Sequence, residues 1–230
     1  AELQVFGWLP YSTRRRNLHQ LLVAYGVTIT RSDTGGMLFT FLKAIDSQKI
    51  PSSRVFNGGS VVYGEPASRV EVLEHGYHYL STTEYEVLYD TQAETVENVL
   101  VTFDKPIYAP SLMVEEGGDL TISSSGTNFA VISGTGILKG KPYVHTVKRL
   151  TADNKDALTE KIVTVEEATL VTVANSESVL ARLSAYYFHA TTVQNSIIVD
   201  GETTGKRYSF ENAFHEPTNA FLAKKSTMVS

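Results

Sequence analysis

The sequence predicts an α+β fold that is mostly antiparallel β-sheet. Many Val, Ile and Thr residues, together with 12 Tyr and 10 Phe, favour strands. Short β-like runs separated by Gly-, Asn- and Asp-containing turns continue through the middle of the chain. Two windows instead repeat their apolar residues with helical spacing. We therefore expect two amphipathic helices beside a small β-sandwich or barrel.

The first helix is predicted to start at Ser12 or Thr13, either of which can cap it, and to stop at Gly26. Its apolar positions follow the i, i+3, i+4, i+7 pattern of a single face: Leu18, Leu21, Leu22 and Tyr25. A β-hairpin should follow, with a turn at 32–36 and a returning strand to residue 41. A helix stripe and a hairpin face this close in sequence should pack together.

The middle of the chain is predicted to form a series of strands. We expect them at 54–63, 69–80, 84–89, 99–103, 107–114, 120–123, 129–133, 137–138, 143–150 and 162–165. A second helix should begin at Asn175 or Ser176 and carry Val179, Leu183 and Tyr187 on one stripe. A second hairpin is expected from 196–199 through a turn at 200–201 to 207–210, and a further strand near 220–223.

Helix-plus-hairpin patterns therefore bracket a run of strands without helices. This order predicts a discontinuous helix-and-hairpin domain, 1–50 plus 169–230, with an inserted all-β domain at 51–168. The alternative is two sequential domains that divide near residue 105. Because the chain starts at Ala1 without an initiator Met, we also expect it to be a piece of a longer protein.

Charge is unevenly distributed along the chain. Residues 1–54 hold 7 basic and 3 acidic side chains, whereas residues 65–119 hold 2 basic and 12 acidic ones. An acidic block is unsuited to a phosphate backbone, so no nucleic-acid partner is expected there. It is either a solvated sheet face or a docking surface for a basic neighbour. The interface candidates are one basic run and six acidic residues: Arg14, Arg15, Arg16, Glu71, Glu74, Glu84, Glu86, Glu94 and Glu97.

Motifs for catalysis, metals and cofactors are missing from the sequence. His75 and His78 are the only close histidine pair, and on a strand their side chains would point to opposite faces. The glycines at 134, 136 and 140 miss the dinucleotide fingerprint by one position. The chain has no Cys, no nucleophile elbow and no apolar run long enough to span a bilayer. We expect no enzymatic activity, no cofactor, no metal and no membrane partner.

Several segments resemble a known family. They are Phe6-Gly7-Trp8-Leu9-Pro10-Tyr11-Ser12, Arg15-Arg16-Asn17-Leu18-His19-Gln20, Ile50-Pro51-Ser52-Ser53-Arg54-Val55-Phe56, Thr102-Phe103-Asp104-Lys105-Pro106 and Glu167-Ala168-Thr169-Leu170-Val171. Together with the turn at Asp33 they resemble phage tail proteins of the baseplate or tail-hub type, encoded in prophages of Gram-positive bacteria. The usual helix start of that family is Arg-Glu-Ala-Leu-Gln, from which Arg16, Asn17 and His19 depart. The matching residues are packing and turn signatures, not a catalytic motif.

The resemblance implies a structural role. It implies two β-barrel-like domains that assemble around the tail axis with other tail or baseplate proteins, commonly as a homotrimer. The location implied is the virion tail, after synthesis in the bacterial cytoplasm. A second hypothesis is a carbohydrate- or receptor-binding β-sandwich module, with Trp8, Tyr77, Tyr79 and Tyr85 as candidate exposed aromatics. A third is a tail-associated hydrolase, against which the missing catalytic motifs argue.

Overall fold

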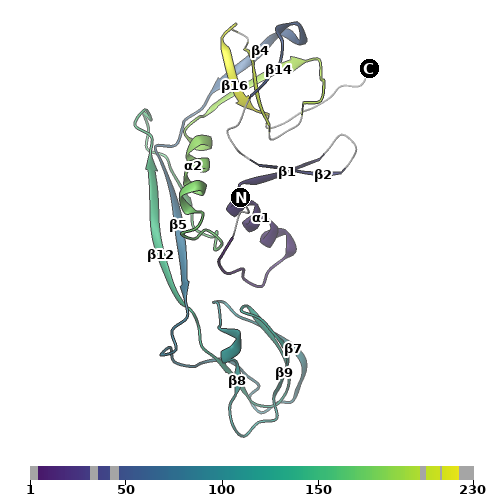
Figure 1. The fold of residues 1–230 in the computed structure, drawn as a ribbon, viewed down its shortest axis with the longest axis vertical. Helices are drawn as coiled ribbons and strands as arrows, with labels where there is room; N and C mark the ends of the chain where they lie inside the picture. The colour runs from purple at the N-terminus through teal and green to yellow at the C-terminus, as the bar shows by residue number, and fades with distance from the viewer. Residues whose placement is uncertain (1–4, 32–35, 42–46, 203–205, 213, 223–230) are drawn as a thin grey trace. The chain divides into compact units, whose positions relative to one another are not determined.

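The computed structural model describes residues 5–31, 36–41, 47–202, 206–212 and 214–222 (Figure 1). The fold in these ranges is mostly β, with mainly antiparallel sheets and two α-helices of 12 residues each. This confirms the predicted α+β class with mostly antiparallel strands. The barrel-like closure of its domains stays a prediction. Neither helix is long and apolar enough to cross a membrane.

The helices are α1 (Arg14–Tyr25) and α2 (Ser176–Tyr187). The strands are β1 (Val27–Arg31), β2 (Met37–Phe41), β3 (Gln48–Lys49), β4 (Val55–Tyr63), β5 (Arg69–His78), β6 (Glu86–Asp90), β7 (Val96–Thr102), β8 (Met113–Val114), β9 (Thr121–Ser125), β10 (Phe129–Gly134), β11 (Ile137–Gly140), β12 (Val144–Asp153), β13 (Ile162–Val165), β14 (Thr191–Ile197), β15 (Arg207–Glu211) and β16 (Pro217–Phe221). Short 3-10 turns occupy Ser52–Arg54 and Ala109–Ser111.

The chain divides into two compact units. Unit 1 contains Ala1–Ala24, Leu73–Arg149 and Glu166–Ser176, and unit 2 contains Tyr25–Val72, Leu150–Val165 and Glu177–Ser230. These boundaries differ from the predicted ones near residues 50 and 168, since each unit draws segments from both predicted domains. The hypothesis that 1–50 and 169–230 fold together around an inserted domain stays a prediction.

The first helix starts and ends where the sequence indicates. The backbone N–H of Arg16 donates to the side-chain hydroxyl of Thr13 at 3.3 Å, so Thr13 caps α1. Gly26 closes the helix with a φ of +66°, in the left-handed region. The predicted apolar stripe was wrong in detail, because Leu18 is exposed and the buried residues of α1 are Gln20 and Ala24.

The first hairpin is confirmed in its strands. β1 and β2 pair antiparallel, from Val27 opposite Phe41 to Arg31 opposite Met37. Most of the predicted turn, residues 32–35, lies outside the described residues.

Unit 1 contains the hydrophobic core found among the described residues. Two three-stranded sheets, β7-β10-β9 and β6-β11-β8, contribute to it. Its buried members are Val101, Phe103, Ile107, Leu120, Ala130, Ile132 and Leu138. Between the two sheets the chain turns at Gly134, whose φ is +107° and whose missing Cβ would lie 2.5 Å from the carbonyl oxygen of Asp119. Only glycine fits this turn without displacing backbone.

One predicted strand of unit 1 is largely replaced by another structure. The run 107–114 forms a single bridge from Ile107 to Pro142, then a 3-10 turn at Ala109–Ser111, and only the two-residue β8. Pro110 lies in that turn and lacks the backbone N–H that a continuous strand ladder would need.

A third sheet has the order β12-β5-β13, and Figure 1 shows the long strands β5 and β12 side by side. β13 pairs parallel to β5, from Ile162 opposite Arg69 to Val165 opposite Val72. Three consecutive residues of β5, Val70, Glu71 and Val72, are buried, so this part of the strand is covered on both faces.

The second predicted hairpin was wrong. β14 pairs antiparallel with β4, from Thr191 opposite Tyr63 to Ile197 opposite Val55. β15 pairs instead with β16 and, in parallel, with β3. The Asp-Gly pair at 200–201 is therefore not a tight hairpin turn but part of a longer connection from β14 to β15, which Arg54 anchors as described below.

Candidate functional site

The predicted basic run lies at the start of α1. Arg14 and Arg15 are exposed. Arg16 forms an ion pair with Glu167 at 3.1 Å, although both side chains are largely solvent-exposed. An exposed pair of this kind contributes roughly 0–1 kcal/mol, so it fixes Arg16 only weakly.

The six predicted acidic residues differ in their exposure and in their partners. Glu84, Glu94 and Glu97 are exposed. The other three have partners within the chain: Glu86 pairs with Lys105, Glu74 accepts a 2.5 Å hydrogen bond from Ser176, and Glu71 is buried with the Thr164 hydroxyl 3.4 Å away. Their assignment as an intermolecular interface stays a prediction.

A histidine pair that the sequence did not indicate lies in unit 1. His75 on β5 is 6% exposed, and its Nδ1 lies 2.9 Å from Nε2 of His145 on β12. Nε2 of His75 lies 3.2 Å from the backbone carbonyl oxygen of Glu166. The two imidazole planes differ by 9°, with centroids 5.1 Å apart. Together with the 2.9 Å nitrogen contact, this spacing places the rings edge to edge rather than face to face.

Tyr77 lies beside the pair. Its ring is within 8° of parallel to that of His145, with centroids 4.9 Å apart, and its hydroxyl donates to the Thr169 carbonyl oxygen at 3.4 Å. Burial raises the pKa of Tyr77 to about 12, so this phenol stays neutral at physiological pH. Burial lowers the pKa of His75; the Glu166 carbonyl opposes that shift, and the charge of His145 adds to it.

In the sequence, His78 is the histidine close to His75, yet in the structure His75 contacts His145, 70 residues away. Nothing local in the sequence identifies that partner, because strand register sets it. His78 is exposed at the end of β5. Among the described residues there is no group of three or more His, Asp or Glu side chains that could hold a metal ion.

A tyrosine cluster also lies in unit 1. The rings of Tyr79 and Tyr108 have centroids 3.9 Å apart, and Tyr143 meets both with its ring at a steep angle. Nearby, the ammonium group of Lys141 lies 4.8 Å from the ring centroid of Tyr85. Tyr79 and Tyr85 are exposed, as the saccharide-binding hypothesis requires, whereas Trp8 and Tyr77 are partly buried.

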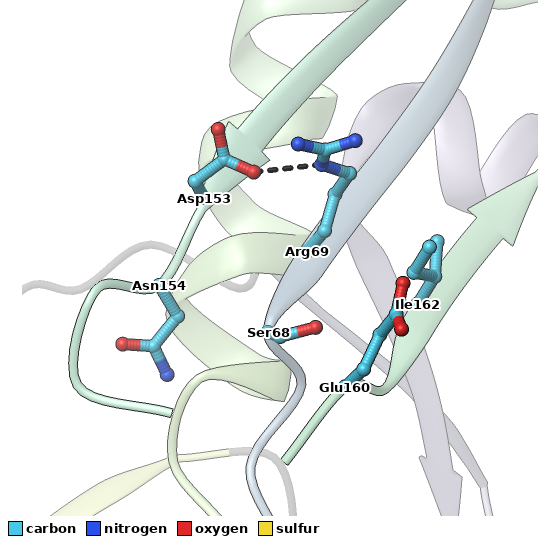
Figure 2. A pocket seen from close by; sticks show the side chains of 6 residues that line it. All are labelled: Ser68, Arg69, Asp153, Asn154, Glu160 and Ile162. Carbon is cyan, nitrogen blue, oxygen red and sulfur yellow. Dashed lines mark hydrogen bonds and ion pairs between the residues drawn. The ribbon is translucent and has the colours of Figure 1, made fainter. Parts of the chain in front are cut away.

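A polar pocket of about 250 Å³ lies in unit 2, at the ends of β5, β12 and β13 (Figure 2). Its lining residues are Ser68, Arg69, Asp153, Asn154, Glu160 and Ile162. Nε of Arg69 donates to Asp153 at 2.7 Å, and this contact raises the pKa of Arg69. Figure 2 shows both side chains in the same part of the pocket.

Four polar side chains of this pocket, those of Ser68, Arg69, Asp153 and Asn154, bond to each other or to the main chain. The Ser68 hydroxyl donates to the Lys161 carbonyl at 3.2 Å and accepts from its N–H at 2.9 Å. The Asn154 amide donates to the Ala67 carbonyl and accepts from the N–H of Asp156. No histidine lines the pocket, so Ser68 has no adjacent imidazole base there. The arrangement joins three strand ends.

Unit 2 contains a second arginine site, and it is far less exposed. Arg54 donates from Nε and Nη2 to the Ile198 carbonyl at 3.0 and 2.7 Å, and from Nη2 to Glu202 at 2.5 Å. Glu202 is 4% exposed and also accepts the N–H of Asp200 at 2.6 Å. Burial alone would raise the pKa of Glu202, but the Asp200 N–H and the Arg54 guanidinium lower it overall. Arg54 thus holds the connection after β14.

No protein family model, curated protein or solved structure matches this chain.

Proposed function

We propose that this chain is a structural component of a phage or prophage tail, of the baseplate or tail-hub type, that assembles around the tail axis as a homo-oligomer. Its role is non-enzymatic and needs no cofactor. Two observations support this: the segments around Trp8, Gln20, Arg54, Lys105 and Thr169 resemble that family, and large apolar side chains lie in solvent.

Large apolar side chains lie in solvent along the described part of the chain, and this exposed apolar surface carries the assembly part of the proposal.

Part of that surface lies on short sheets of unit 2. The β1-β2 and β14-β4 sheets contain two strands each, and isolated two-stranded sheets are marginally stable in water. They carry large apolar side chains in solvent: Met37 and Phe39 on β2, and Phe56, Val62 and Tyr63 on β4, of which Met37 is 77% and Tyr63 71% exposed. Contact with further copies would cover such residues.

The test is analytical ultracentrifugation of the chain, and of any longer protein that contains it, over a hundredfold concentration range. We expect concentration-dependent association, and closed rings by electron microscopy. The double substitution Phe56→Ser and Tyr63→Ser should shift the equilibrium to monomer, whereas Leu158→Ser, at a loop residue that is 99% exposed, should not. A monomer at every concentration in both proteins would refute assembly.

Saccharide binding by the tyrosine cluster is a second candidate. Tyrosine side chains that are partly exposed can stack on sugar rings, and their hydroxyls and a nearby ammonium group can hydrogen-bond to sugar hydroxyls. Titration with purified Gram-positive cell-wall polysaccharide should show binding that Tyr79→Ala and Tyr85→Ala abolish. Tyr186→Ala, which removes a 66% exposed tyrosine of unit 2, is the matched control. Equal binding by all three variants would refute this candidate.

A further inference from the structure

The His75–His145 pair joins three segments of unit 1. His75 belongs to β5, His145 to β12, and the carbonyl that His75 contacts belongs to Glu166. The segment that begins at Glu166 also approaches β5 through two further hydrogen bonds. The His75 backbone N–H donates to Val171 at 2.7 Å, and the Tyr77 hydroxyl donates to Thr169 at 3.4 Å.

The partners fix the proton positions on both rings. A carbonyl oxygen only accepts, so Nε2 of His75 must carry a hydrogen toward Glu166. In neutral His75 the other nitrogen, Nδ1, is then unprotonated and accepts. Nε2 of His145 must therefore donate to it across 2.9 Å. This network requires both neutral imidazoles to be Nε2–H tautomers.

The same geometry accepts one proton but opposes two. A proton on Nδ1 of exposed His145 leaves its Nε2–H donating to His75, so the hydrogen bond survives and becomes charge-assisted. A second proton must go to Nδ1 of His75. Two N–H groups would then face each other at 2.9 Å between two cations. Both protons can be held only if the rings separate.

Among the described residues, no carboxylate acts on the His75 imidazole to offset that repulsion. On β5, Glu74 bonds to Ser176, Tyr77 is a neutral phenol, and His78 lies beyond Gly76 on the opposite face of the strand. On β12 the facing group is His145 itself. From the third segment, Glu166 presents its carbonyl and Glu167 pairs with Arg16. The charged group that acts on the His75 imidazole, among the described residues, is His145.

We propose that His75 and His145 form a proton-sensitive latch that holds the Glu166–Val171 segment against β5 at neutral pH and releases it when both imidazoles are protonated. Below pH 6.5 the opened chain binds a proton at His75 that the closed pair does not bind, so the closed state loses stability as pH falls. The pKa of His75 is lowered in the closed state, as this pH dependence requires.

Histidine-selective NMR tests the proton positions. At pH 7.5 we expect His75 and His145 both to be Nε2–H tautomers, and on acidification we expect His75 to take up its proton only below pH 6.5. Titration of His75 at or above the ordinary histidine pKa of 6.5, or an Nδ1–H tautomer of His75, would overturn the proposal.

Hydrogen exchange tests the release. After correction for intrinsic rates, opening at the His75 amide, which donates to the Val171 carbonyl, should rise at least tenfold from pH 7.5 to 5.0, since each coupled proton changes an equilibrium by up to about tenfold per pH unit. His145→Gln can still donate to His75 but takes up no proton, so its pH dependence should be much flatter. His189→Gln, at an exposed histidine of unit 2, should behave as wild type. Opening in His145→Gln that matches wild type at pH 5.0 would overturn the latch.

Discussion

The two arginine–carboxylate pairs of unit 2 offer a direct test of how burial sets the energy of an ion pair. Arg54 has 19% of its side chain exposed and Glu202 has 5%, whereas Arg69 and Asp153 have 44% and 56%. The two short N–O contacts are similar, at 2.5 and 2.7 Å. The free energy lost on removing the arginine should therefore differ mainly through desolvation.

Arg54→Ala should lower the free energy of unfolding of unit 2 by about 3–5 kcal/mol, because it leaves the buried Glu202 carboxylate without its cation. It also removes both donors to the Ile198 carbonyl. Arg69→Ala should cost much less, since both members of its pair are solvated. Glu202→Gln should cost less than Arg54→Ala, at about 2 kcal/mol, because the amide remains an acceptor but loses its charge.

Hydrogen exchange of the β4 and β14 amides measures these differences within unit 2. Fluorescence of the single tryptophan, Trp8, reports on unit 1 and should not change. The folded pKa of Glu202 lies below its ordinary 4.5, so its stabilisation is present above pH 4.5 and is lost as pH falls further. Glu202→Gln should reduce that acid loss. The reasoning fails if Arg54→Ala destabilises β4 and β14 no more than Arg69→Ala does.

Three further predictions concern the core, a turn and the basic run. Ile132→Ala should cost about 2–5 kcal/mol in urea unfolding followed by tryptophan fluorescence, because Ile132 is fully buried, while Leu158→Ala should change stability by under about 0.5 kcal/mol. Gly134→Ala should destabilise unit 1 by more than about 1 kcal/mol in the same assay, and more than Gly117→Ala, whose φ is also positive but whose Cβ would meet open space. Replacing Arg14, Arg15 and Arg16 with Glu should slow assembly most at low salt if their charge steers the encounter between copies, and light scattering can measure the rate. If the variant assembles at the wild-type rate at both low and high salt, that role is refuted.

Local signals predicted the elements of this fold better than their partners. Thr13 and Gly26 bound α1 as capping rules require, and β13 occupies the predicted range 162–165, because these features depend on neighbours in sequence. The apolar stripe predicted on α1 was wrong in detail because a polar residue, Gln20, is buried, and its side chain forms a hydrogen bond with Thr169. An apolar pattern cannot identify such a position.

The sequence did not predict which strands, far apart along the chain, pair with each other. The hairpin expected after α2 fitted the turn chemistry of residues 200–201, yet β14 pairs with β4, more than 120 residues earlier. Arg54 and Glu202 meet because of that pairing, and His75 meets His145 because β5 lies beside β12. Each contact follows from strand register, which a single sequence does not specify when several strands have similar alternation.

Thr169 shows how the latch segment connects to the N-terminal part of unit 1. Its hydroxyl lies 2.5 Å from the carbonyl oxygen of Trp8 and 2.7 Å from the side-chain oxygen of Gln20. A hydroxyl has one proton and can donate to only one of two acceptors, so the Gln20 amide must be turned to donate its NH₂ to Thr169 while Thr169 donates to Trp8. The Thr169 hydroxyl then accepts from Gln20 and donates its single proton to Trp8, so it joins the two segments. Its own carbonyl accepts from Tyr77, next to the histidine pair. Release of the segment at Glu166 would therefore loosen the contacts that hold Trp8 and Gln20, and with them the helix that presents the basic run to solvent.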